Sequence, residues 1–460
     1  MTEKKYLRWY NKVGYGSGDI AGNVVYALLS SFVMIFLTNT VGLSSGIVGT
    51  LIAVSKLFDG VTDILFGAMI DKTRTRMGKA RPWMLWGYLG CAVTLAAIFF
   101  IPADMSDFAK YAWFFIAYTL LNAVFYTANN IAYSALTALV TKNSAERVQM
   151  GSIRFVFAFG TSLLIQSVTV GAVAALGGGA SGWRWMAVIY AVIGLVTNTL
   201  SVLSVKELPE EELAEDAVPD APEEAYSLAD AARLLAANRY YLIICVTYIL
   251  MQVYTATLNM GIFYMTFVLG NENLLGVFSW AINLPIIVGL MLTPILVEKF
   301  RGMYRLNLGG YIIGTIGRAL VLAAGYLHSI PLMLLFSGVA AFGMSPLQGD
   351  LNALIASCSE YTFLTKGKRV DGTMYSCTSL GVKIGGGLGT ALCGWLLEWS
   401  GYDGFAAVQS ADCLNMLHIM YLWIPMVINL AITLLLFRLN VEKENQRLRE
   451  LTPAAGVECP

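Results

Sequence analysis

Long apolar runs, separated by short polar breaks, fill most of the chain between residues 15 and 437. Counted between those breaks, the runs predict twelve spans: residues 15–39, 46–70, 83–102, 110–140, 149–177, 184–205, 240–269, 276–297, 306–327, 330–355, 373–400 and 412–437. Each run has about 20 residues or more, the length that crosses the hydrocarbon core of a bilayer as a helix. Because lipid offers backbone polar groups no partners, we predict an all-α membrane protein.

The positions of the basic residues predict how the spans are oriented. If the N-terminus is cytoplasmic, the loops on that side hold 24 of the 30 Lys and Arg residues, and the opposite loops hold only Lys110 and Arg184. Cytoplasmic loops of membrane proteins carry an excess of Lys and Arg. We therefore predict an inner-membrane protein with both termini in the cytoplasm.

The longest polar break, residues 206–239, contains an acidic run and two prolines. We interpret it as a cytoplasmic linker between an N-terminal six-helix half, residues 1–205, and a C-terminal six-helix half, residues 240–437. Residues 438–460 are predicted to be an amphipathic or disordered cytoplasmic tail. Two such halves resemble the major facilitator fold, in which the solute site lies near the middle of the bilayer between the halves.

Composition excludes several classes of function. Hydrophobic residues make up 57% of the chain and charged residues 13%, well below the roughly 25% of soluble domains. The 30 basic residues are balanced by 30 acidic ones, which gives no field for collecting nucleic acid. The seven cysteines include no C-x-x-C pair, and no Ser-His-Asp or Cys-His grouping is visible. We therefore predict neither an enzyme nor a cofactor, no obligate protein partner and, from the polar first 14 residues, no removable signal peptide.

Charged side chains inside the predicted spans are candidates for function, because an uncompensated charge in lipid is costly. Eight residues meet this description: Asp19, Lys56, Asp59, Asp63, Arg154, Arg318, Asp350 and Lys383. We assign no site role to Arg318 and Asp350, which we interpret as an interhelical pair or as residues near span ends.

The second predicted span carries three charges on one helix face. Asp63 follows Asp59 by four residues, Lys56 precedes Asp59 by three, and Thr62 lies one residue aside. Two carboxylates on one face repel unless a proton, a hard monovalent cation or a basic partner lies between them. The pattern favours a cation site. The alternative is a structural ion-pair network of the same three residues that fixes helix packing.

Asp19, in the first span, follows three alternate glycines at positions 14, 16 and 18, which would let a neighbouring helix or a ligand approach closely. A carboxylate accepts sugar hydroxyl protons and an arginine such as Arg154 donates to hydroxyl oxygens, so sugar contact is one interpretation. A salt bridge from Asp19 to Arg154 or Lys383 is the other. In the fourth span, Thr127, Asn129 and Asn130 could equally contact a solute or a neighbouring helix.

Several motifs together resemble the glycoside-pentoside-hexuronide:cation symporters, the melibiose carrier family. They are Lys56-Leu-Phe-Asp-Gly-Val-Thr-Asp63, the following loop Asp71-Lys-Thr-Arg-Thr-Arg-Met-Gly-Lys-Ala-Arg-Pro-Trp83, Tyr15-Gly-Ser-Gly-Asp19, Arg147 to Arg154, and Gly367-Lys-Arg through Tyr375-Ser376 to Lys383. The resemblance runs over most of the chain.

The resemblance implies roles for individual residues. Asp59 and Asp63 would bind Na⁺, Li⁺ or H⁺, with Thr127 as a further ligand. Thr62 stands where the family has an Asn and would also lie at the cation site. Asp19 and Arg154 would contact the sugar, and Lys383 would bridge the two sites. Asn130 replaces the family's sugar-binding Asp and Ser134 a nearby Trp, which implies a different sugar and possible changes in the coupling ion.

The loop charges Asp71, Arg74, Arg76, Lys79 and Arg81 resemble the family's latch for the cytoplasmic helix ends, although plain positive-inside topology also accounts for them. We therefore predict a secondary transporter that couples a sugar or glycoside to a cation by alternating access. Two alternatives remain open at this point. One is an exporter or carrier of another polar or amphipathic solute, and the other is a non-transporting membrane sensor.

Overall fold

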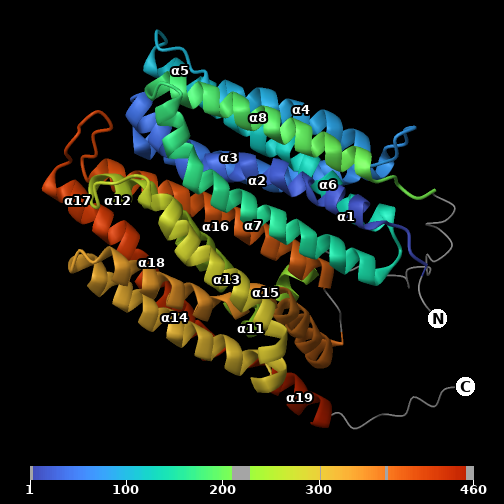
Figure 1. Ribbon diagram of the computed structural model, residues 1–460. Coiled ribbons are helices and arrows are strands. Elements are labelled where there is room, and N and C mark those ends of the chain that lie inside the picture. Colours follow the sequence, from blue (N-terminus) through green and yellow to red (C-terminus); the bar gives the residue numbers. More distant parts are fainter. Residues whose placement is uncertain (1–3, 210–227, 301, 368–370, 452–460) are drawn as a thin grey trace, which may run out of the picture. The chain divides into compact units, whose positions relative to one another are not determined.

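The computed structural model describes residues 4–209, 228–300, 302–367 and 371–451, and every regular element in them is a helix (Figure 1). Within these described residues, eleven helical segments are long and apolar enough to cross a membrane: Trp9–Thr40, Arg81–Phe99, Asp107–Val140, Gln149–Ala175, Gly179–Ser204, Arg239–Phe267, Leu274–Phe300, Met303–Tyr326, Ile330–Lys366, Cys377–Trp399 and Ala411–Leu451. The predicted all-α multi-pass membrane protein is confirmed. The predicted span 46–70 corresponds to a further helix, Ser45–Lys72, which is not among the eleven.

Among the described residues, ten helical elements precede the predicted linker. They are α1 (Trp9–Gly16), α2 (Gly18–Ile35), η1 (Phe36–Thr40), α3 (Ser45–Lys72), α4 (Arg81–Phe99), α5 (Asp107–Thr119), η2 (Leu120–Tyr126), α6 (Thr127–Val140), α7 (Ser144–Ala175) and α8 (Gly179–Ser204). The elements η1 and η2 are short π-helical turns inside their spans. Such turns occur frequently at functional sites.

The remaining elements follow the predicted linker. They are α10 (Leu228–Ala237), α11 (Arg239–Asn259), α12 (Gly261–Phe267), α13 (Leu274–Phe300), α14 (Met303–Tyr326), α15 (Ile330–Lys366), α16 (Asp371–Trp399), α17 (Ala411–His418), the π-turn η3 (Ile419–Trp423), α18 (Ile424–Leu436) and α19 (Val441–Leu451). Much of the predicted linker, residues 210–227, lies outside the described residues, and so do residues 452–460 of the tail.

Local sequence accounts for where many of these helices begin and end. The Asn143 side chain accepts the Glu146 N–H at 3.0 Å before α7, and Ser106 does the same for Ala109 before α5. These are the N-cap bonds that satisfy free N–H groups at a helix start. Pro82 lies in the first turn of α4, where its missing N–H costs nothing. The helix α15 ends at Gly367, whose φ of +69° favours glycine.

By contacts between residues the chain divides into two compact units. The first comprises residues 1–221, 259–279 and 390–417, and the second comprises 222–258, 280–389 and 418–460. In the first unit, α2 packs between α7 and α8, and α4 packs on α8 (Figure 1). A Cβ at Gly194 would lie 1.8 Å from the Tyr88 hydroxyl, so only glycine permits this approach of α8 to α4.

Within the second unit, α14 and α15 form the most extensive helix pair. A Cβ at Gly310 would lie 2.3 Å from the Gly343 carbonyl, and one at Gly343 would lie 2.5 Å from the Gly310 carbonyl. Small residues let membrane helices pack backbone to backbone in this way. The fully buried Arg318 of α14 lies over the Tyr254 ring, 5.0 Å from its centroid, and donates to its hydroxyl.

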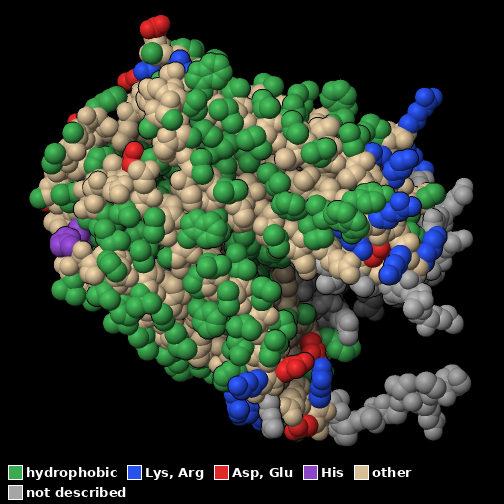
Figure 2. Space-filling model, viewed as in Figure 1, with side chains coloured by type: hydrophobic (Ala, Val, Ile, Leu, Met, Phe, Trp, Pro, Cys, Tyr) green, Lys and Arg blue, Asp and Glu red, His purple; other side chains and the backbone are tan. Residues whose placement is uncertain are grey.

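The outer surface matches a lipid environment. Side chains such as Phe155, Val156 and Leu164 on α7 are more than half exposed, which lipid tolerates and water does not. Figure 2 shows hydrophobic side chains over the middles of the helices and Lys and Arg at the end where the chain begins. Such a surface suits a bilayer.

Within the predicted tail, residues Val441–Leu451 form the amphipathic helix α19. In α19, Glu442 accepts the Met303 and Tyr304 N–H groups at 3.1 and 2.9 Å, and Asn445 donates to the Ser357 carbonyl at 2.8 Å. These bonds hold α19 against the start of α14 and against α15 in the second unit.

Candidate functional site

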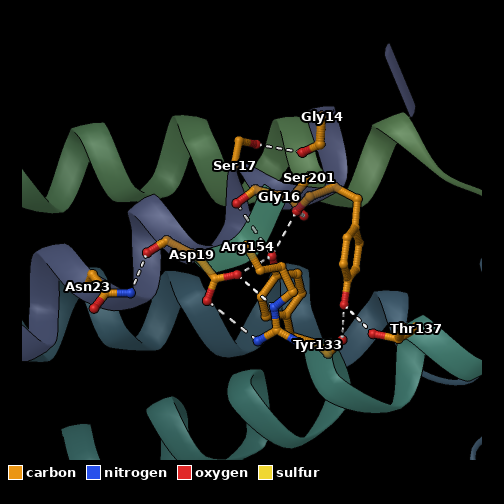
Figure 3. A network of polar contacts seen from close by, with 10 residues as sticks. Gly14, Gly16, Ser17, Asp19, Asn23, Tyr133, Thr137, Arg154 and Ser201 are labelled. Carbon is orange, nitrogen blue, oxygen red and sulfur yellow. Dashed lines mark hydrogen bonds and ion pairs between the residues drawn. The ribbon is translucent and has the colours of Figure 1, made fainter. Parts of the chain in front are cut away.

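The side chains of Arg154 and Tyr133 meet at the carboxylate of Asp19, and the three residues come from three different helices (Figure 3). The Arg154 Nε donates to Asp19 Oδ2 at 2.7 Å and its Nη2 reaches Oδ1 at 3.5 Å. The Tyr133 hydroxyl, from α6, donates to the same Oδ2 at 2.8 Å. The salt bridge that the sequence offered as an alternative for Asp19 is therefore present in the ligand-free protein. In this salt bridge the Asp19 side chain is 15% exposed and the Arg154 side chain 24% exposed, so neither is sealed in the core.

Aromatic rings hold the guanidinium in place. The Arg154 guanidinium lies 4.1 Å from the centroid of the Tyr133 ring and 6.0 Å from that of Tyr15. The Tyr15 hydroxyl is bound in turn to Thr137 Oγ1 at 2.6 Å. Cation–π contact keeps a charge tolerable where water is scarce, while the donor edge of the guanidinium stays directed at Asp19.

The alternate glycines before Asp19 serve helix contact, the first of the two roles that the sequence allowed. A Cβ at Gly18 would lie 2.8 Å from the Tyr133 ring and 2.9 Å from Ser201 Oγ. Similar contacts hold Gly14 against Ser204 and Gly16 against Ile153. The glycines bring α1 and α2 onto α6, α7 and α8, which places Tyr133 and Arg154 at the carboxylate.

Replacing Gly18 with alanine is expected to displace the Tyr133 ring, because a contact of 2.8 Å is too short for a real Cβ. We expect a loss of about 1–3 kcal/mol in stability, typical of overpacking, together with weaker solute binding. Gly309→Ala is the matched control, since a Cβ there meets nothing within 4 Å. Thermal unfolding of the purified variants in detergent tests this, and equal melting temperatures for the two variants would contradict it.

Two neighbouring asparagines of the fourth span have different roles. Asn129 is buried and donates to the Met84 carbonyl at 2.8 Å and to Asn198 Oδ1 at 3.0 Å, so it joins helices. Asn130 is exposed. It precedes Tyr133 by three residues and therefore shares its helix face, one turn from the Asp19 cluster. Of the two asparagines, only Asn130 has an exposed side chain, and its contact with a solute stays a prediction.

A further polar pair extends the cluster along α2. Asn23, one turn after Asp19, donates to the Asp19 carbonyl at 2.9 Å, and its Oδ1 accepts from Ser162 of α7 at 3.3 Å. Sequence analysis missed Asn23, Ser162 and Tyr133. The spacing from Asp19 to Asn23 was a usable signal, whereas a tyrosine in an apolar span is usually a core residue.

The proposed cation ligands lie on α3 and at the start of α6. Asp59 is buried and Asp63 half-buried on α3. The Thr62 hydroxyl donates to the Phe58 carbonyl at 3.1 Å, and the buried Thr127 hydroxyl donates to the Asn122 carbonyl at 2.9 Å. Both hydroxyls use their proton on backbone, so their oxygen lone pairs remain for a cation. The contacts of α3 with η2 and α6 bring the two elements together.

Among the described residues, no three His, Cys, Asp or Glu side chains form a cluster suited to a transition metal. The candidate ligands are instead carboxylate and hydroxyl oxygens, which suit hard cations. Lys383 is half-buried on α16 and belongs to the second unit. Its place in the site stays a prediction.

The predicted gating loop lines a cavity of about 700 Å³ with Arg74, Arg76, Lys79, Arg81 and Lys206. The carboxylate of Glu207 accepts the N–H groups of Lys79, Ala80 and Arg81 at 2.6 to 3.0 Å, which fixes this loop to the end of α8. Arg81 also donates to the Val202 carbonyl at 2.9 Å. The Asp71 side chain lies outside the described residues, and the gating role stays a prediction.

Comparison with known proteins assigns the family. Residues 14–443 match the family model described as MFS/sugar transport protein, MFS being the major facilitator superfamily. The chain belongs to this family. The resemblance to glycoside-pentoside-hexuronide:cation symporters is thereby confirmed, and the protein is a transporter rather than an enzyme.

Two relatives match this chain over most of its length. The isoprimeverose transporter of Lactiplantibacillus pentosus is 27% identical, covering 93% of this chain and 88% of its own. A putative glycoside/cation symporter of Escherichia coli is 28% identical, covering 99% and 98%. The crystal structure of a D-xylose–proton symporter is similar with a TM-score of 0.65 at 17% identity, covering 95% of this chain and 98% of that one. At that identity the last likeness shows the fold alone.

Proposed function

We propose that this protein imports a sugar or glycoside across the bacterial inner membrane, coupled to Na⁺, Li⁺ or H⁺, by alternating access. The single observation that carries the proposal is the Asp19–Arg154–Tyr133 cluster, a charged and aromatic group inside apolar spans whose two charged side chains are partly exposed. An accepting carboxylate and a donating guanidinium match the hydroxyl groups of a sugar, and the adjacent rings suit its apolar face. The names of the glycoside/cation symporter and isoprimeverose transporter relatives support this cargo class.

In this proposal, each ligand replaces a contact that the empty protein makes with itself. A sugar hydroxyl pair would share Asp19 with Arg154, and Asn130 would contact the solute from the next turn of α6. A cation bound by Asp59, Asp63, Thr62 and Thr127 would neutralise the paired carboxylates. Lys383 would then bridge the cation and sugar sites.

Coupling follows from the cost of unpaired charge in a membrane. The empty protein and the doubly loaded protein each have their charges balanced, so both can change between inward- and outward-open states. A half-loaded protein retains a buried charge without its partner and is held back. Movement of the sugar is thereby tied to movement of the cation.

Uptake into vesicles tests the proposal. Radiolabelled pentosides, galactosides, glucosides and hexuronides are offered under imposed Na⁺ or proton gradients. We expect one class to accumulate and to lose accumulation when one gradient collapses. If a folded, inserted protein accumulates none of them under either gradient, export of another polar solute becomes the better interpretation.

A further inference from the structure

The N-terminus of α3 binds a carboxylate from the far end of the sequence. Glu398, in the last turn of α16, accepts hydrogen bonds through Oε2 from Ser44 Oγ at 2.8 Å, Ser45 Oγ at 3.3 Å and the Gly46 N–H at 3.4 Å. No acidic residue lies in the first turn of α3 itself. A helix start carries free N–H groups and a partial positive charge, so a carboxylate there is stabilising.

The usual capping function is already fulfilled without Glu398. The Ser44 side chain accepts the Ile47 N–H at 3.3 Å, which is an ordinary N-cap bond. Glu398 therefore adds a bond between two helices that are more than 350 residues apart in sequence. Its contribution is to the attachment of α16 to α3 rather than to the formation of α3.

Close backbone packing surrounds the carboxylate. A Cβ at Gly49 would lie 3.1 Å from the Ala391 Cα, and one at Gly394 would lie 2.4 Å from the Ser45 carbonyl. The Trp395 indole N–H donates to Thr50 Oγ1 at 2.8 Å, across the same two helices. We call this contact of residues 44–50 with residues 390–398 the α3–α16 seam. Both of its sides lie in the first unit.

The loop after α16 continues the attachment. The Tyr402 hydroxyl donates to Asn39 Oδ1 at 2.6 Å, and a Cβ at Gly404 would lie 2.2 Å from the Thr38 carbonyl. A separate contact joins α13 to α7, where a Cβ at Gly276 would lie 2.7 Å from the Ser167 Cα. Elements of the predicted C-terminal half are thus fastened to the predicted N-terminal half at the end of the spans away from the basic loops.

We propose that Glu398 is the latch that keeps this end of the transporter closed. The inference rests on the proposed alternating access, in which the two halves separate at one end at a time. Because the α3–α16 seam is made largely of small residues, few side chains interlock across it. The two helices can therefore separate there without disrupting a packed core. The charge-assisted bonds of Glu398 are the interactions that opening must break, and their loss shifts the population toward the state open at this end.

A cysteine behind the seam measures the opening directly. Ala53 lies one helical turn beyond Gly49 on the same face of α3, so we place a cysteine there and apply a membrane-impermeant maleimide from the side of the seam. Labelling of the parent protein, which has its native cysteines, is subtracted. Neither sugar nor cation is needed, so the measurement is independent of the uptake panel.

We expect Glu398→Gln to speed labelling of the Ala53→Cys protein by about fivefold, the effect of losing partly exposed charge-assisted bonds. Ser45→Ala, which removes one donor, should give a smaller increase. Glu272→Gln is the matched control, because Glu272 is an exposed acid in the loop between α12 and α13. It should leave the rate unchanged.

Three results would overturn the latch: equal labelling in Glu398→Gln and the control, fast labelling already before any change to Glu398, or no labelling in any variant. If labelling speeds up as expected but the protein accumulates no sugar, the proposed function is wrong and the latch stands. If the protein accumulates sugar but Glu398→Gln does not change labelling, the latch is wrong and the proposed function stands.

Discussion

Arg154→Ala is expected to abolish sugar uptake and to destabilise the protein, whereas Asp19→Ala combined with Arg154→Ala should restore stability without restoring uptake. The single change leaves the largely buried Asp19 carboxylate with only the Tyr133 hydroxyl of its two side-chain donors. Removing one partner of a buried ion pair costs about 3 kcal/mol. Removing both charges avoids that cost, since no uncompensated charge remains.

Thermal unfolding in detergent and vesicle uptake, measured on the same preparations, separate the two interpretations of the pair. A structural salt bridge predicts that the double variant is both stable and active. A sugar site predicts that it is stable and inactive. Normal uptake by the double variant would therefore remove Asp19 and Arg154 from the substrate site.

Asp59→Asn is expected to reduce cation-driven accumulation to the level seen without a gradient. Asp59 is 7% exposed on α3, and an amide cannot supply the charge that balances a bound cation or carry a proton. The sugar site is built from other helices, so sugar binding should persist. Accumulation under the effective gradient, beside equilibrium binding of the same sugar, measures both effects.

Asp107→Asn is the control for Asp59→Asn, because Asp107 is an exposed acid in the first turn of α5. It should accumulate sugar as the unaltered protein does. If the Asp59 variant also accumulates normally, the carboxylates of α3 are a structural network with Lys56 rather than the cation site.

The sequence was sufficient for the spans because hydrophobicity and charge act over about 20 residues, a scale that composition reports well. It also identified Asp19 and Arg154, since charges inside apolar runs are few. It could not pair them with Tyr133, because which face of α6 meets α2 depends on packing across three helices. Glu398 escaped notice for a related reason: an acid near a span end is ordinary until its partner 350 residues away is known.

Asn129 and Asn130 show the same limit at a finer scale. Adjacent asparagines in one span carry identical chemistry, yet a difference of one position places one between helices and the other at an exposed face. From residue type alone, solute contact and helix contact were equally expected for each of them. The direction of each side chain, which the fold determines, separates them.

The π-turn η2 sets that direction. A π-turn contains one residue more than an α-helical turn, whereas each residue of a regular α-helix rotates it by about 100°. If residues 120–126 were wound as regular α-helix with the same number of residues, everything after them would be rotated relative to α5. Thr127, Asn130 and Tyr133 would then face away from their present partners together. The extra residue held in η2 therefore decides which face of α6 meets the neighbouring helices, while the span stays equally hydrophobic.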